Sequence, residues 1–424
     1  MGLAHWRRSV VARNTAWMTL GQGGRTVLQA AYFIIIGRAL RPDGYGAFVA
    51  ATALSALVAP FAGIGAGNVL IQHVARDRQT FHHYWGGALM ATFAGGALSV
   101  GVAALVGRAI LPTTIATSLI ICVAASDLLF NTVLYLCGQA YQAHEKMMRT
   151  AQLPIVTTMF RLVAAVLFMS LPGAKTVGRW GVFYLGCTAL STVAALWMAS
   201  GELGRPVLRF SFGVRELRQG MYFAAGFSAQ NVYNDIDKTM LSRLSTLGAT
   251  GIYGAAYRII DVSLVPLRSL VAAAYPKFFQ HGARGVAASL TVARRLVPVA
   301  VAYGLAAGAV LFVTAPLLPR VLGHDYANAV EAVRWLALLP VLKSIQFFAA
   351  DTLTGAGYQG TRTTLQVTVA ILNVGINIPL IIGWSWRGAA WASLLTDAIL
   401  ATLLWLVVWR YRNRAAAGIP AAAV

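Results

Sequence analysis

Residues 84–107 read YWGGALMATFAGGALSVGVAALVG and contain no charged side chain. A helix of this length rises about 36 Å, which is enough to cross the hydrocarbon core of a bilayer, about 30 Å thick. Similar apolar stretches follow one another from Asn14 to Arg410, separated by short basic or Gly- and Pro-containing connections. The chain is 58% hydrophobic and 11% charged, whereas an average soluble domain is about 25% charged. These features predict an integral membrane protein.

A hydropathy window of about 19 residues predicts about twelve transmembrane helices, so the expected fold class is an all-α polytopic membrane protein. The first six predicted spans cover 14–38, 44–71, 84–107, 113–138, 150–171 and 179–201. The second six cover 219–243, 251–279, 293–317, 328–353, 362–385 and 387–410.

Lys and Arg are unequally distributed between the two sides of these spans. With the N-terminus in the cytoplasm, the cytoplasmic connections carry 19 of them and the opposite connections carry eight. The positive-inside rule therefore predicts that both termini are cytoplasmic. The expected location is the cell inner (plasma) membrane, as a multi-pass protein. The net charge of +21 follows from the same bias towards anionic lipid headgroups, and no connection is long enough for a nucleic-acid-binding domain.

The ends of the first and seventh predicted spans have similar sequences. Residues 37–48 read GRALRPDGYGAF and residues 242–256 read SRLSTLGATGIYGAA, each passing from an Arg and a nearby Leu through a Gly-containing turn into small residues. Any Gly-rich membrane hairpin shares part of this pattern, but matching halves are typical of transporters built from repeats. We therefore expect two pseudo-symmetric six-helix bundles around a central cavity.

The expected domains follow from this division. They are a cytoplasmic N-terminal segment (1–13), an N-terminal bundle (14–201), a cytoplasmic linker (202–218), a C-terminal bundle (219–410) and a basic cytoplasmic tail (411–424).

Ionisable residues inside the spans are the clearest functional signal, since each costs about 2.5–3.5 kcal/mol at the bilayer centre. They form polar stripes at helical spacing on three spans. These are Gln22, Arg25, Gln29 and Tyr32 on the first; Asn231, Asn234, Asp235, Lys238 and Ser242 on the seventh; and Arg258, Asp261 and Arg268, with Tyr253 and Tyr257, on the eighth. Asp235 and Lys238 are one turn apart and should form an ion pair.

Arg25, Lys238 and Arg258 predict a hydrated cationic cavity that attracts an anion. Guanidinium groups suit phosphate, and the neighbouring amides and hydroxyls suit sugars, so the expected cargo is a lipid-linked phosphate or pyrophosphate. The predicted substrate-binding residues are Arg25, Lys238, Arg258, Gln22, Gln29 and Tyr257. Asp235, Asp237 and Asp261 are candidates for binding a coupling H⁺ or Na⁺, and no other cofactor, metal site or catalytic residue is expected.

Other polar residues in the spans have simpler interpretations. Asn131, Asn373 and Asn377 are predicted to form hydrogen bonds between helices. For Asp127, Asp351 and Asp397, hydrogen bonding between helices and lining of the hydrated cavity are equally good interpretations. Arg161, Arg268, Arg334 and Lys343 are predicted to extend their charged ends towards the interface. Cys122, Cys137 and Cys187 lie in apolar spans without metal-ligand spacing.

Four stretches resemble the polysaccharide transporters of the multidrug/oligosaccharidyl-lipid/polysaccharide (MOP) exporter superfamily, which includes the MATE transporters. They are GRALRPDGYGAF (37–48), DIDKTMLSRLSTLGATGIYGAAYRI (235–259), LGHDYANAVEAVRWLAL (322–338) and NVGINIPLIIGWSWRGAAWAS (373–393). Each motif is loose, but the four occur in the family's order along the whole chain. The chain departs from lipid II flippases in having no charge between 44 and 71, which disfavours a peptidoglycan precursor as cargo.

This resemblance implies a flippase that moves undecaprenyl-pyrophosphate-linked oligosaccharide repeat units from the cytoplasmic to the periplasmic leaflet by alternating access. The pathway would be exopolysaccharide or O-antigen (lipopolysaccharide) biosynthesis. Arg25, Asp237, Lys238, Tyr257 and Arg258 match positions that line the cationic cavity of the superfamily. The expected partners are the lipid-linked oligosaccharide, membrane lipids, and a polysaccharide polymerase with its chain-length machinery, but no nucleic acid.

Two alternatives remain open. A cation-coupled drug exporter of the same superfamily would need more acidic than basic residues in its cavity, whereas the first and eighth spans are predominantly basic. A membrane-embedded polysaccharide polymerase or glycosyltransferase would need a large periplasmic loop or a catalytic carboxylate site, and neither is evident. We therefore expect a transporter and no enzymatic activity.

Overall fold

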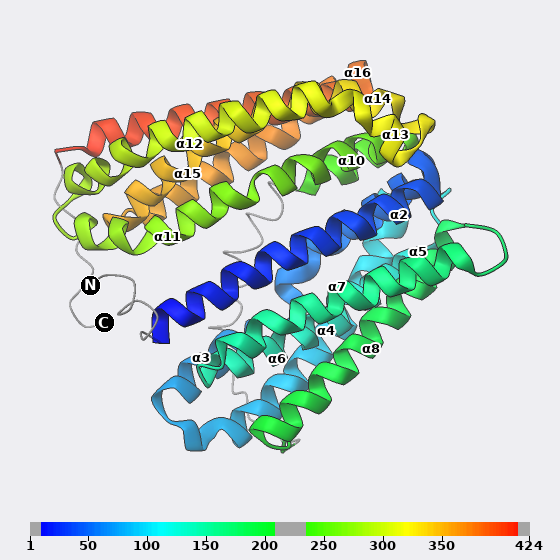
Figure 1. The fold of residues 1–424 in the computed structure, drawn as a ribbon, viewed down its shortest axis with the longest axis horizontal. Helices are drawn as coiled ribbons and strands as arrows, with labels where there is room; N and C mark the ends of the chain where they lie inside the picture. The colour runs from blue at the N-terminus through cyan, green and yellow to red at the C-terminus, as the bar shows by residue number, and fades with distance from the viewer. Residues whose placement is uncertain (1–9, 208–234, 414–424) are drawn as a thin grey trace. The chain divides into compact units, whose positions relative to one another are not determined.

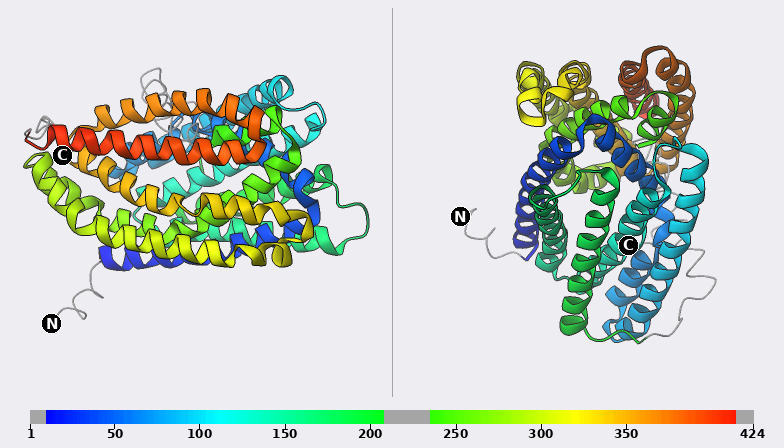
Figure 2. Two further views of the ribbon diagram at one scale, coloured as in Figure 1. Left: turned by 90° about the horizontal axis from the view of Figure 1, so that it is seen from above. Right: turned by 90° about the vertical axis from the view of Figure 1, so that its right-hand side faces the viewer.

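The structure is a computed structural model that describes residues 10–207 and 235–413, with the backbone alone described at 10–22, Ala75 and Arg76. All regular secondary structure in these ranges is helical, as predicted. Packing divides the chain into two compact units, Met1–Arg243 and Leu244–Val424. The helices of both units are drawn in Figures 1 and 2.

The first unit contains helices of unequal length. They are α2 (Val10–Ala62), α3 (Ala66–Arg76), η1 (Arg78–Thr80), α4 (Phe81–Ile110), α5 (Thr117–Ala124), η2 (Ala125–Phe130), α6 (Asn131–Ala143), α7 (Met147–Ser170) and α8 (Val177–Leu203). Residues 235–244, which open the second described range, are also helical. A buried core that includes Trp85 and Tyr141 joins α3, α4, α6, α7 and α8.

The second unit has a comparable set of helices. They are α10 (Leu247–Ser263), α11 (Val265–Gly282), α12 (Val286–Thr314), η3 (Ala315–Leu317), α13 (Leu318–Leu322), η4 (His324–Tyr326), α14 (Ala327–Leu336), α15 (Leu339–Gly355) and α16 (Gln359–Tyr411). Helix α15 packs between α12 and α16, as the adjacent ribbons in Figure 1 illustrate.

The two longest helices are each two spans joined at a break. A straight helix of 53 residues would be about 80 Å long, far more than the bilayer core. In α2, Arg41 leaves helical geometry (φ 56°, ψ 174°) just before Pro42, and in α16 Ser385 does so (φ 55°, ψ −134°). Each break lies at the boundary predicted between two spans. The predicted spans other than 219–243 all fall on helices that the structure describes. Most of 219–243 lies outside the described residues.

Three of the predicted spans contain an interruption. Span 44–71 is broken between α2 and α3, where Ile64 (φ 48°) and Gly65 (φ 61°) are left-handed. Span 251–279 bends by 45° between α10 and α11, just before Pro266. Span 328–353 bends by 41° between α14 and α15, just before Pro340. Glycine permits the left-handed turn, and proline removes a backbone donor at each bend.

By length and composition, seven described helices can cross a membrane, and nine can if each bent pair counts as one span. The breaks at Arg41 and Ser385 divide two of these further. The chain is a multi-pass membrane protein. The predicted domain boundaries at 202–218 stay a prediction, because most of that linker and the following span lie outside the described residues.

Glycines on α4 and α12 allow these helices to approach irregular backbone closely. A Cβ on Gly96 would lie 2.8 Å from the carbonyl oxygen of Leu128, in the π-helical turn η2. A Cβ on Gly308 would lie 2.5 Å from the carbonyl oxygen of Ala337, at the bend between α14 and α15. In each predicted half, a glycine of the third span (Gly96 or Gly308) therefore packs against an irregular turn of the fourth span.

We expect Gly308→Ala to lower the melting temperature, because its new methyl group would overlap the Ala337 carbonyl. Gly101→Ala is the matched control, since a Cβ there meets nothing within 4 Å, and alanine gains up to about 1 kcal/mol over glycine in a helix. Thermal unfolding of the purified variants in detergent measures both effects. Equal melting temperatures for the two variants would contradict this account of the close contact.

Candidate functional site

The candidate residues of the first span lie along α2 in the first unit. Arg25 and Gln29 are half-buried and one turn apart, and Gln29 Oε1 accepts a hydrogen bond from Arg25 Nε at 3.1 Å once its amide is oriented to satisfy both groups. Tyr32, the next polar residue of the stripe, is buried with its ring 5.9 Å from that of Trp180. The side chain of Gln22 lies outside the described residues.

The candidate residues of the seventh span lie in helical residues 235–244. Lys238 Nζ lies 2.6 Å from Asp235 Oδ1, which confirms the predicted ion pair, and the lysine side chain is only 13% exposed. Asp237 is buried, and its Oδ1 accepts a hydrogen bond from the backbone N–H of Lys238 at 2.8 Å. Two carboxylates thus lie within one turn of a half-buried cation.

The candidate residues of the eighth span lie on α10 in the second unit. Arg258 and Tyr257 are half-buried, and the Tyr257 ring lies 4.8 Å from that of Tyr253. The guanidinium of Arg258 makes no ion pair or hydrogen bond with another residue that the structure describes. Asp261 instead pairs with Arg268 at 2.9 Å across the break at Leu264. Whether the stripes of the two units face one common cavity stays a prediction.

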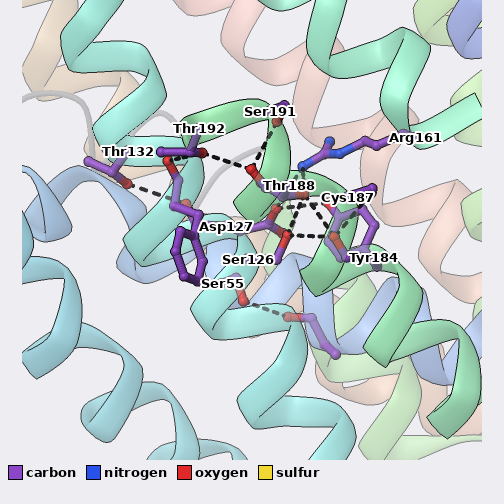
Figure 3. Close-up of polar contacts among 12 residues, drawn as sticks. Ser55, Ser126, Asp127, Thr132, Arg161, Tyr184, Cys187, Thr188, Ser191 and Thr192 are labelled. Atoms are coloured by element: carbon purple, nitrogen blue, oxygen red, sulfur yellow. Dashed lines mark hydrogen bonds and ion pairs between the residues drawn. The ribbon is translucent and has the colours of Figure 1, made fainter. Parts of the chain in front are cut away.

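A polar cluster in the first unit was missed by the sequence interpretation. Arg161 on α7 lies 3.3 Å from Asp127 Oδ1, so the prediction that Arg161 extends towards the interface is wrong. Tyr184 on α8 donates a hydrogen bond to the same carboxylate oxygen at 2.8 Å, and the Arg161 guanidinium lies 4.4 Å from the centre of the Tyr184 ring. Thr188 connects Arg161 (3.4 Å) with Ser126 (2.8 Å), as Figure 3 shows.

The backbone at this cluster is a π-helical turn, η2, which includes Asp127. Such a turn disturbs the regular hydrogen bonding of the helix and is often found at functional sites. Two of its carbonyl oxygens accept hydrogen bonds from hydroxyl groups. Thr132 Oγ1 donates to the carbonyl oxygen of Asp127 at 3.3 Å, and Thr192 Oγ1 donates to the carbonyl oxygen of Phe130 at 3.0 Å. Both carbonyl groups therefore have polar partners within the protein, as the bilayer requires.

Two ion pairs in the second unit join neighbouring spans. Lys343 Nζ lies 2.7 Å from Asp397 Oδ1 with both side chains largely buried, so the prediction that Lys343 extends to the interface is also wrong. Arg362 Nη1 lies 3.5 Å from Asp351 Oδ1 and donates a hydrogen bond to Thr354 Oγ1 at 2.8 Å. Asp127, Asp351 and Asp397 therefore each pair with a cation of another helix.

The predicted interhelical role is confirmed for Asn373, whereas the hydrogen bonds of Asn377 lie within its own helix segment. Asn373 Nδ2 donates a hydrogen bond to Thr396 Oγ1 at 3.0 Å, joining the two segments of α16 on either side of Ser385. Asn377 Nδ2 donates to Asn373 Oδ1 at 3.0 Å. Both residues are buried.

One sequence signal could have identified the Arg161 pair. Arg161 lies about halfway along its predicted span, and an arginine at that depth has its side chain too far from either surface to reach water. A carboxylate at similar depth in a neighbouring span, Asp127, was the natural partner. The sequence alone does not say which spans are neighbours.

Residues 11–281 match the family described as "Polysaccharide biosynthesis protein". The chain belongs to this family. The matched region extends from the first predicted span through the eighth and so contains Arg25, Lys238 and Arg258. No curated protein matches the chain in sequence.

Several solved transporter structures have the same fold as this chain. An inward-facing multidrug-resistance MATE transporter of the MOP superfamily has a TM-score of 0.74 at 15% identity, covering 91% of this chain and 94% of its own. An outward-facing structure has a TM-score of 0.64 at 15% identity, covering 96% of both chains. A MOP transporter from Pyrococcus furiosus, whose structure is described as having a binding pocket of reverse polarity, has a TM-score of 0.65 at 16% identity and 95% coverage of both chains. The chain therefore has the fold of these solved MOP-superfamily transporters.

We expect Arg161→Ala to lower the free energy of unfolding by about 3 kcal/mol, because it leaves the Asp127 carboxylate without its cation. Adding Asp127→Asn should recover part of this loss, since the amide needs no counter-ion. Arg268→Ala is the control, because that pair is about half exposed and exposed pairs contribute up to about 1 kcal/mol. Unfolding by SDS titration measures all three. Equal losses for Arg161→Ala and Arg268→Ala would contradict a buried role for the first pair.

Proposed function

We propose that this polysaccharide-biosynthesis transporter is a flippase for lipid-linked oligosaccharides. It would move undecaprenyl-pyrophosphate-linked repeat units from the cytoplasmic to the periplasmic leaflet by alternating access, for exopolysaccharide or O-antigen synthesis. The observation that carries the proposal is the family match over residues 11–281, which includes each cationic residue of the predicted substrate site.

The charges of the candidate spans support an anionic cargo. Arg25 and Arg258 are half-buried cations, and the Arg258 guanidinium is available to a ligand because it has no ion pair among the described residues. A guanidinium binds two phosphate oxygens in parallel, so a pyrophosphate linked to a sugar fits these side chains better than an organic cation does.

The strongest competing function is export of cationic drugs, because solved structures with this fold include multidrug transporters. At 15% sequence identity, this similarity indicates a shared fold but does not indicate which cargo is transported. The pocket described as having reverse polarity belongs to another transporter of this fold, and it supports the view that pocket charge varies between these proteins. A polymerase or glycosyltransferase is the less favoured alternative, because the family and fold are those of transporters.

The proposed location is the inner membrane with both termini in the cytoplasm, where the undecaprenyl-linked cargo is assembled. The proposed partners are a polysaccharide polymerase and its chain-length machinery, because a repeat unit that has crossed the membrane must next be polymerised.

The first functional test is transport of a lipid-pyrophosphate oligosaccharide in sealed proteoliposomes, with a membrane-impermeant probe of headgroup exposure. We expect translocation by the unmodified protein and a loss of at least tenfold in Arg25→Ala and Arg258→Ala. Arg334→Ala is the matched control, because its guanidinium is exposed against the Phe312 ring at 4.9 Å and should leave transport unchanged.

Folding is checked for each variant by monodisperse elution. Lys238→Ala is combined with Asp235→Ala, so that a loss of transport does not arise from a carboxylate left without its cation. Normal transport by the folded Arg25 and Arg258 variants would reject the cationic site while leaving the family intact. No transport of this cargo, together with export of a cationic dye, would favour the drug exporter.

The coupling ion is tested with imposed gradients in the same vesicles. We propose that Asp235, Asp237 and Asp261 include the site of a coupling H⁺ or Na⁺. If so, at least one of Asp235→Asn, Asp237→Asn and Asp261→Asn should transport cargo at a rate that no longer responds to a pH or Na⁺ gradient. Gradient dependence retained in all three variants would exclude these carboxylates.

A further inference from the structure

The longest stretch of this chain without an acidic residue lies in the second unit and contains a cluster of cations. No Asp or Glu occurs between Asp261 and Asp325. The middle of this stretch carries Lys277, Arg284, Arg294 and Arg295. A basic cluster without nearby carboxylates keeps its full charge, because internal ion pairs are not available to neutralise it.

These residues lie on a helical hairpin formed by the end of α11 and the start of α12. The turn between the two helices runs from Gly282 to Gly285, and Gly285 has φ 105°. All four cationic side chains are exposed, as is His281, and none has an ion pair with another described residue. We call Lys277, His281, Arg284, Arg294 and Arg295 the basic hairpin.

Exposed aromatic rings flank the charges of the basic hairpin. Tyr275 and Phe279 are each 39% exposed, and their rings lie 5.0 Å apart in an edge-to-face arrangement. In the last turns of α11 the buried side chains are Ala274 and Phe278. Exposed aromatic rings beside Lys and Arg are typical of helices at the membrane–water interface.

The distance of the two α12 arginines from the start of their helix agrees with a position of the basic hairpin at the membrane–water interface. Arg294 and Arg295 lie about two turns, or about 12 Å, from the first residue of α12. Arginine side chains at that depth extend their guanidinium groups back towards lipid phosphates.

The end of α16 adds charge on the same side of the unit. Arg410 and Arg412 are exposed, and the Arg412 guanidinium lies 4.7 Å from the centre of the Trp409 ring. Figure 1 and the left view of Figure 2 place this end of α16 at the same end of the unit as the α11–α12 turn. The α14 end of the unit differs, because Glu331 there pairs with Arg387 at 2.8 Å.

We propose that the basic hairpin is a binding site for anionic phospholipid headgroups. The four cations bind the phosphodiester oxygens, while Tyr275 and Phe279 contact the adjoining glycerol and acyl region. This site is independent of the proposed cargo. A soluble polyanion would use the cations but would leave the exposed aromatic rings unexplained, so the surrounding bilayer is the partner that fits both features.

The test is native mass spectrometry of the delipidated full-length protein with equal amounts of dioleoyl-phosphatidylglycerol and dioleoyl-phosphatidylcholine. We expect the unmodified protein to retain the anionic lipid preferentially, and the double variant R294Q/R295Q to lose that preference by at least fivefold. The control R108Q/R243Q removes the same charge from two exposed arginines outside the hairpin that also have no ion pair in the described structure, and should keep the preference.

Folding is verified by the elution and melting temperature of each variant, and K277Q/R284Q provides a second pair if R294Q/R295Q is unstable. Equal loss in the hairpin and control variants would overturn the proposal, because total charge would then explain binding. Displacement of the bound lipid by inorganic pyrophosphate at low millimolar concentration would also overturn it, by assigning the site to a free phosphate group. Retention of phosphatidylcholine and phosphatidylglycerol in equal amounts would show that the cations do not select the headgroup.

Discussion

The structure depends on the absence of water from the bilayer core. Backbone N–H and C=O groups there must bind one another, so the described spans are helices, and an irregular turn needs other groups of the protein to bind its backbone. The π-helical turn at Asp127 illustrates this constraint, because Thr132 and Thr192 hydroxyls bind carbonyl oxygens of that turn.

The same constraint governs the charges. An unpaired charge in the hydrocarbon region is costly, and three carboxylates inside the two units each have a cation from another helix: Asp127 with Arg161, Asp397 with Lys343, and Asp351 with Arg362. These pairs join helices within a unit and leave a smaller group of cations for function. Arg258 is the clearest of these, since its guanidinium has no such pair among the described residues.

Some helices pack through close backbone contact at glycine. In the membrane, apolar side chains gain little by leaving lipid, so van der Waals contact between backbones becomes important. Gly96 and Gly308 place α4 and α12 directly against irregular turns, one in each unit. This repetition agrees with the sequence similarity between residues 37–48 and 242–256.

Hydropathy alone was sufficient to predict an all-helical membrane protein and the positions of the spans that the structure describes, because the length of a membrane helix is set by the bilayer and not by its neighbours. Spacing along one helix also predicted the Asp235–Lys238 pair, since its two members are one turn apart. The breaks at Ile64, Leu264 and Leu338 lie inside single predicted spans, because Gly and Pro mark places where a helix can break without requiring it to do so. Only the tertiary structure decided that Arg161 and Lys343 are internal partners of Asp127 and Asp397, because a pair on different helices depends on which spans are neighbours and on how each is rotated.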